Sequence, residues 1–172
     1  MNKPVIIFLM LIGSVISLSA LAGDVTVKWQ NPASYTDIDP AEEDRARFED
    51  HLFKSFNQIF ADLALTLPDN YHWEVNVTDL DLAGDARPRA AAGGREMRLM
   101  NPNSRPAISF DYTLTDGQGK VVSQGKVDLK DPNYLSRSPQ IVGVAVKPFP
   151  YEEFMINQWF VQQQSQKIFP VR

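Results

Sequence analysis

The 172-residue chain contains no cysteine and only two histidines, His51 and His72. Without cysteine it can form no disulfide bond, and without a His-Glu-x-x-His pattern a zinc site is not expected. The sequence also lacks a Gly-x-x-x-x-Gly-Lys phosphate loop, a Gly-x-Gly-x-x-Gly turn and a Gly-x-Ser-x-Gly turn. No cofactor is therefore predicted, and no residue is identified as a catalytic nucleophile or base.

Positive charge is scarce as well. Lysine and arginine together number 17 against 21 aspartate and glutamate residues, which gives a formal net charge of -4 at pH 7. Proteins that bind nucleic acids without sequence preference neutralise phosphates with lysine and arginine. Nucleic acid is therefore not an expected partner.

The one long apolar run lies at the start of the chain. Lys3 precedes uncharged residues from Val5 to Leu18, and the small-residue step Ala20-Leu21-Ala22 follows. This layout predicts a signal peptide over residues 1–22, cleaved after Ala22, and a mature chain in the periplasm. The alternatives are a retained anchor and a buried apolar helix, but no lysine or arginine cluster follows the run to fix an anchor. No membrane span is expected after cleavage.

Residues 23–172 are expected to form a single domain, because a chain of this length can bury a sufficient apolar core. Alternating residues predict a strand at 25–29. Asp39 and Pro40 have the order of an N-cap and a first helical residue, and apolar residues at three- and four-residue steps extend this helix to Ala64 or Leu65.

A second strand is predicted from Tyr71, with Trp73, Val75 and Val77 on its apolar face. The pattern then changes phase, because Leu80 and Leu82 become the apolar residues and a regular strand would bury Asp79 and Asp81. Burying two carboxylates is costly, so a bulge or strand end is expected near Thr78 and Asp79.

A hairpin and a final helix complete the pattern. The hairpin pairs residues 108–115 with residues 120–129, whose Val121, Val127 and Leu129 should point inward. A helix should begin near Pro150, with an apolar stripe formed by Tyr151, Phe154, Met155 and Trp159. We predict an α+β two-layer sandwich: a mainly antiparallel or mixed sheet of four to five strands with two helices on one face.

Between these elements, residues 83–105 form a segment rich in glycine, alanine and proline, with a short strand expected around Met97–Leu99. The segment carries five arginines and no lysine, and guanidinium groups suit carboxylate or phosphate ligands. Arg95 and Arg98 are the candidate contact residues. The alternative is that these arginines balance nearby acidic residues. The arginines are Arg87, Arg89, Arg95, Arg98 and Arg105.

Asp79, Asp81 and Asp85 place three carboxylates within seven residues, so they are candidate calcium ligands, although their spacing departs from an EF-hand loop. Asp79 and Asp81 could alternatively form an acid and base pair on a sugar substrate. The alternative without a functional site is a solvated strand end whose aspartates pair with nearby arginines. Trp159, in an aromatic helix that is apolar over more than one side, is a further candidate partner contact.

Several blocks of the mature chain occur together in one known family. They are Val25–Trp29, Tyr35–Asp37, Val77–Gly84, Asp116–Gly117, Leu129–Asp131, Asn133–Leu135, Tyr151–Glu152, Met155 and Trp159–Phe160. In these blocks the sequence resembles the uncharacterised secreted proteins of Gram-negative bacteria grouped as domain of unknown function 3016. Glu153 stands where the resemblance leads us to expect a basic residue. The resemblance implies export and a shared fold, and it implies no activity.

Together these patterns favour a soluble periplasmic binding or accessory protein without catalysis, which contacts an unidentified protein or an anionic small molecule. Two alternatives stay open: a hydrolase that uses Asp79 and Asp81, and a module stabilised by calcium. Neither ligand identity nor oligomeric state is predicted.

Overall fold

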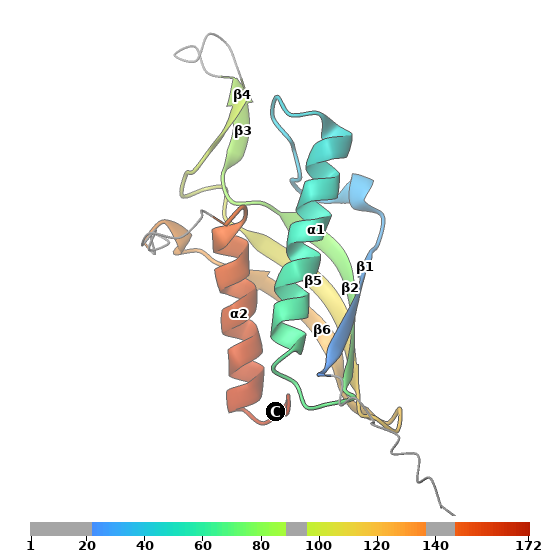
Figure 1. Ribbon diagram of the computed structural model, residues 1–172. Coiled ribbons are helices and arrows are strands. Elements are labelled where there is room, and N and C mark those ends of the chain that lie inside the picture. The colour runs from blue at the N-terminus through green and yellow to red at the C-terminus, as the bar shows by residue number, and fades with distance from the viewer. Residues whose placement is uncertain (1–21, 89–95, 137–146) are drawn as a thin grey trace, which may run out of the picture.

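The computed structural model describes residues 22–88, 96–136 and 147–172. A four-stranded sheet in the order β1-β2-β5-β6 carries two helices, α1 and α2, on one face (Figure 1). The sheet strands are β1 (Asp24–Trp29), β2 (His72–Asp81), β5 (Ala107–Thr115) and β6 (Val121–Lys130), and the helices are α1 (Arg45–Ala64) and α2 (Pro150–Ser165). Short 3-10 turns cover Pro32–Ser34 (η1) and Tyr134–Ser136 (η3).

Strand pairing makes the sheet mixed. β1 runs parallel to β2, with α1 as the connection, whereas β2–β5 and β5–β6 are antiparallel. The two helices start at the same end of the molecule, near the strand pair described below (Figure 1). The predicted α+β two-layer arrangement is therefore confirmed, with four strands in the main sheet.

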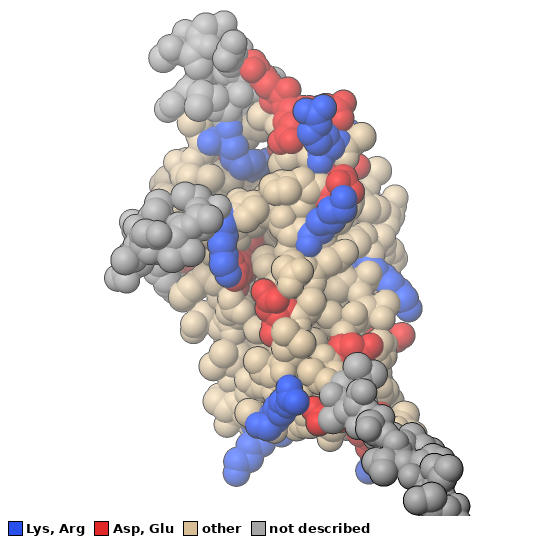
Figure 2. Space-filling view, in the orientation of Figure 1, with Lys and Arg blue, Asp and Glu red and all other residues tan. Residues whose placement is uncertain are grey.

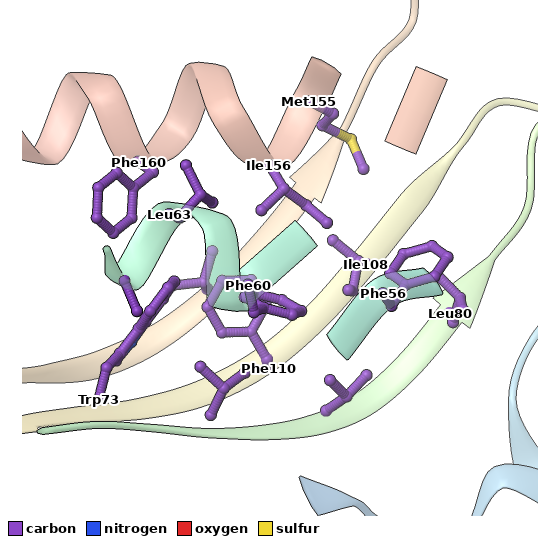
Figure 3. Close-up of a cluster of buried hydrophobic side chains, with 14 of the residues drawn as sticks. Phe56, Phe60, Leu63, Trp73, Leu80, Ile108, Phe110, Met155, Ile156 and Phe160 are labelled. Carbon is purple, nitrogen blue, oxygen red and sulfur yellow. The ribbon is translucent and has the colours of Figure 1, made fainter. Parts of the chain in front are cut away.

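The core lies between the helices and the sheet. Apolar residues of β2 and β5 lie opposite each other in the antiparallel pair. Trp73 is paired with Leu114, and Val77 is paired with Phe110. α1 and α2 contribute side chains that pack onto this face, as Figure 3 shows for Phe56, Phe60, Met155, Ile156 and Phe160. We call Phe60, Trp73, Trp159, Phe160 and Phe169 the aromatic core, because their rings contact one another.

The predicted bulge is confirmed. The register between β2 and β5 shifts between Val77 and Asp79, and both Val77 and Leu80 are fully buried. The extra residue moves the apolar pattern to the other phase, so Asp79 and Asp81 remain partly exposed.

The predicted start of α1 is wrong by one turn and more. The helix begins at Arg45, and its N-cap is Asp44, whose Oδ1 accepts a hydrogen bond from the Arg47 amide at 3.0 Å. Asp39 instead accepts from the amide of Ala41, and Ala41 has a left-handed φ of 56°. That conformation cannot continue into a right-handed helix, so residues 39–43 form a turn.

Two side chains differ from their predicted orientation. Val121 is 47% exposed, because a register shift between Leu114 and Thr115 changes the phase of β6 at its start. In α2, Phe154 is also exposed, whereas Ile156 is fully buried and belongs to the core stripe. The predicted start of α2 at Pro150 is confirmed.

A separate two-stranded sheet extends beyond the end of β2 (Figure 1). It pairs β3 (Asp85–Pro88) with β4 (Glu96–Leu99) in antiparallel register. The strand expected at Met97–Leu99 is therefore confirmed, and β3 is additional. The apolar run at residues 141–146, which could add a strand by its sequence, lies outside the described residues. Among the described residues, no helix has the length and apolar character to cross a membrane.

Candidate functional site

A cavity of about 660 Å³ opens where α1 and α2 begin. Its wall consists of the turn before α1, the first turns of both helices, the β2–β3 connection and the end of β4. We call it the α1–α2 cleft. Its apolar lining includes Phe48, Leu82, Met100, Phe149 and Tyr151, and its polar lining includes Asp39, Glu43, His51, Arg98, Lys147 and Glu152. A volume of this size, with apolar and aromatic side chains beside polar groups, is typical of small-molecule sites.

Arg98 from β4 holds one wall of the cleft together. Its guanidinium donates to both carboxylate oxygens of Asp37, from Nη1 at 2.9 Å and from Nη2 at 3.1 Å. The same group donates to the carbonyl oxygens of Gly84 and Asp39. These bonds join β4, the β2–β3 connection and the turn before α1, so Arg98 is engaged inside the protein.

Asp79 also forms hydrogen bonds inside the protein. Its carboxylate accepts hydrogen bonds from the amide and the hydroxyl of Thr36, at 2.7 and 2.6 Å, and from the amide of Leu80. Nearby, Tyr35 donates its hydroxyl to the carbonyl of Val77. Burial, assisted by the negative charge of Asp79, raises the pKa of Tyr35 to about 12. Asp79 therefore fastens the segment after η1 to β2.

Asp81 lies at the end of β2 beside Asp37, with which it forms an isolated parallel bridge. Burial raises the pKa of Asp81, the charge of Asp37 raises it further, and Lys130 and Arg98 oppose the shift. Asp79 and Asp81 are thus close in sequence but have different surroundings, since Asp79 has three hydrogen-bond donors.

Glu152, in the first turn of α2, carries an ionisable carboxyl group and yet is only 2% exposed. Its Oε1 accepts a hydrogen bond of 2.7 Å from the amide of Ala83. Burial raises the pKa of Glu152, and the Ala83 amide and the charge of Arg98 lower it in part. We call Asp37, Asp81, Arg98 and Glu152 the charged cluster, because their charges act on one another at one side of the cleft.

Trp159 lies outside the lining of the α1–α2 cleft. It is seven residues beyond Glu152 on α2, about 10 Å along the helix axis. Its ring stacks on Trp73 and meets Phe110 edge-on, with centroids 6.2 and 5.1 Å apart. Part of it lines a shallow hollow between α2 and β6, so its main role is in the aromatic core.

The structure brings Asp81 and Arg98 together in the charged cluster, and Asp79 lies on the same strand as Asp81. Asp85 begins the adjoining β3. The prediction for Arg95 lies outside the described residues. Sequence reasoning missed Asp37, Glu152 and Phe149. The signal for Glu152 was a charged residue one position after Tyr151, at the start of an apolar stripe.

The part of the chain that the structure describes holds no group of three or more histidine, aspartate or glutamate side chains placed to bind a metal ion. The calcium hypothesis for Asp79, Asp81 and Asp85 stays a prediction, and so does the hydrolase hypothesis.

Comparison with known proteins gives a family and no activity. No curated protein matches the chain. Residues 23–162 match the family described as "Protein of unknown function (DUF3016)", and this match covers most of the chain. The resemblance predicted from the sequence blocks is confirmed, and the chain belongs to the DUF3016 family.

Proposed function

We propose that this protein is exported to the periplasm and acts there, without catalysis, as a soluble binding protein whose ligand enters the α1–α2 cleft. The observation that carries the proposal is the cleft itself, a cavity of about 660 Å³ walled by Phe48, Phe149 and other apolar side chains. When a ligand covers the apolar surface of a hollow of this size and removes it from water, the free energy of the complex falls.

The way the cleft is built supports binding further. Arg98 ties three separate chain segments into one wall, and Glu152 ties α2 to the β2–β3 connection. A wall held by hydrogen bonds of this kind is already ordered before a ligand arrives, so binding costs little conformational entropy. The Asp39 turn and α1 complete the opposite side.

The export part of the proposal is supported by the leader sequence, with its apolar run after Lys3 and its small residues at Ala20 and Ala22. Mass spectrometry of the protein purified from a periplasmic fraction tests it. We expect the measured intact mass to equal that of a chain that begins at Gly23. Full-length protein with Met1 attached, found in the cytosolic fraction, would contradict export.

The binding part is tested by blocking the cleft. His51 is exposed on α1, lines the cleft, and its ring lies 5.9 Å from that of Phe149. His51→Trp should fill the space, whereas Lys54→Trp places the same ring at an exposed position of the same helix that does not line the cleft. The readout is NMR of the labelled protein mixed with the small-molecule fraction of a periplasmic extract.

We expect amide signals of Ala83 and Tyr151 to shift in the wild type and in Lys54→Trp, and to stay unchanged in His51→Trp. Unshifted cleft signals in the wild type would contradict the proposed function. So would equal shifts in both tryptophan variants, because the blocked cleft would then be irrelevant to the interaction.

A further inference from the structure

We propose that the ligand of the α1–α2 cleft is a hydrophobic cation, an apolar body that carries a protonated amine, with Glu152 as its counter-ion. This inference rests on the binding function proposed above and names the ligand's chemistry.

The first step concerns the buried carboxylate. Glu152 lines the cleft and is 2% exposed, and the donor to its Oε1 is a neutral backbone amide, that of Ala83. Among the described residues, the two cations of the cleft pair elsewhere: Arg98 with Asp37, and Lys147 with Glu153. Arg98 therefore acts on Glu152 only through its charge at a distance, without an ion pair among the described residues. A buried carboxylate that no cation contacts is costly, and a bound ammonium group would supply that contact.

The second step excludes an anion on the same residues. Both cations just named already face carboxylates that lie outside the cleft lining. Helix N-termini attract anions, and both helices begin at the cleft. However, Asp44 already caps α1, and Glu152 already occupies the first turn of α2. In the part of the chain that the structure describes, a ligand carboxylate would therefore meet Glu152 with both cations of the cleft already paired.

The third step concerns the apolar walls. The rings of Phe48 and Phe149 meet edge-on with centroids 6.4 Å apart, and Tyr151 lines the same cleft. Aromatic faces attract cations and also bury the apolar part of a ligand. The carboxylates of Asp39 and Glu43 lie at the same cavity, so its lining adds further negative charge. Figure 2 shows acidic side chains gathered where α1 begins. Aromatic rings beside a buried carboxylate suit an arylalkyl or alkyl amine.

The experiment uses three probes with the same ring system: naphthylmethylamine, naphthylmethanol and naphthoate. Each is titrated into the mature protein and followed by NMR at Ala83 and Tyr151. We expect the amine to bind about tenfold more tightly than the alcohol, and naphthoate to bind most weakly. Glu152→Gln keeps an oxygen for the Ala83 amide but removes the charge, so the amine should lose its advantage.

The matched control is Glu74→Gln, on the strand face away from the helices, which should keep the preference for the amine. Three outcomes separate the claims. If no probe shifts the cleft signals, the proposed binding function fails together with this inference. If the alcohol or naphthoate binds as tightly as the amine, or if Glu152→Gln retains the preference, binding stands and the cationic ligand is wrong.

Discussion

The aromatic core and the charged cluster lie toward opposite ends of α2, and different interactions hold them. In the aromatic core, Phe160 and Phe169 pack around Trp73 with ring centroids 5.2 to 5.7 Å apart. In the charged cluster, directional bonds such as Arg98 to Asp37 join segments that enclose a cavity. Close packing leaves no space for a ligand, whereas bonded polar groups can hold a hollow open. We therefore place the main source of stability at one end of the molecule and the proposed binding site at the other.

The largest expected effect tests the aromatic core. Phe60 is fully buried against Trp73 and Phe110, so Phe60→Ala removes its contacts and leaves a cavity. We expect the free energy of unfolding to fall by about 3–5 kcal/mol in urea titrations. Phe154→Ala, at an exposed position on α2, should change it by less than about 1 kcal/mol. Similar losses in both variants would contradict the assignment of the core.

The second prediction breaks the charged cluster. The side chains of Arg98 and Asp37 are 18% and 23% exposed, so Arg98→Met leaves a partly buried carboxylate without its partner. We expect a loss of about 2–3 kcal/mol. Arg45→Met removes the exposed pair with Glu49 and should cost less than about 0.5 kcal/mol.

A double variant sharpens this result. Adding Asp37→Leu to Arg98→Met removes the carboxylate that was left unpaired, so part of the lost stability should return. If the double variant loses the sum of the two single losses, the pair is not coupled, and the described role of Arg98 is wrong.

The sequence predicted the aromatic end better than the charged end, for a physical reason. Alternation at Trp73, Val75 and Val77 and the three- and four-residue steps in α1 report burial directly, because each apolar side chain must find the core. Even the bulge at Asp79 followed, since the pattern changed phase. The start of α1 did not follow, because both Asp39 and Asp44 have N-cap chemistry and only Ala41's backbone decides between them.

The cleft could not be predicted in the same way. Glu152 is buried by a contact with Ala83, which lies 69 residues earlier in the chain. Arg98 was recognised as a candidate, but its partner Asp37 lies 61 residues away and no local pattern connects them. Pairings at such separations depend on the tertiary fold rather than on local periodicity.

A third, smaller effect is expected at Asp79. The carboxylate of Asp79 accepts hydrogen bonds from the amide and the hydroxyl of Thr36, and Asp79→Asn removes its negative charge. We expect a loss of about 1–2 kcal/mol and faster hydrogen exchange at the Thr36 amide. Asp50→Asn, on the exposed side of α1, serves as control, and should leave both measurements nearly unchanged. Unchanged exchange at Thr36 in the Asp79 variant would contradict the bond.

The smallest effect is a pH dependence at Glu152. Burial raises its pKa in the folded state, while Asp81 from β2 adds to the shift and Arg98 from β4 opposes it. A carboxyl group of this kind binds its proton more tightly in the folded state. The wild type should therefore lose stability relative to Glu152→Gln as pH rises from about 4.5 through that pKa.

Urea titrations of both proteins across this range measure the difference. Asp81 also titrates with a raised pKa, but it is present in both proteins, so its contribution to the stability difference largely cancels. A stability difference that is constant with pH, or one that grows in favour of the wild type as pH rises, would contradict a raised pKa.

The central claim, that the α1–α2 cleft binds a ligand against Glu152, is tested most directly by a crystal structure of the mature protein with naphthylmethylamine. The account predicts the naphthyl ring in the cleft against the exposed faces of Phe48 and Phe149, with the amine nitrogen about 3 Å from a carboxylate oxygen of Glu152. A probe bound elsewhere, with the cleft closed by its own side chains, would contradict it.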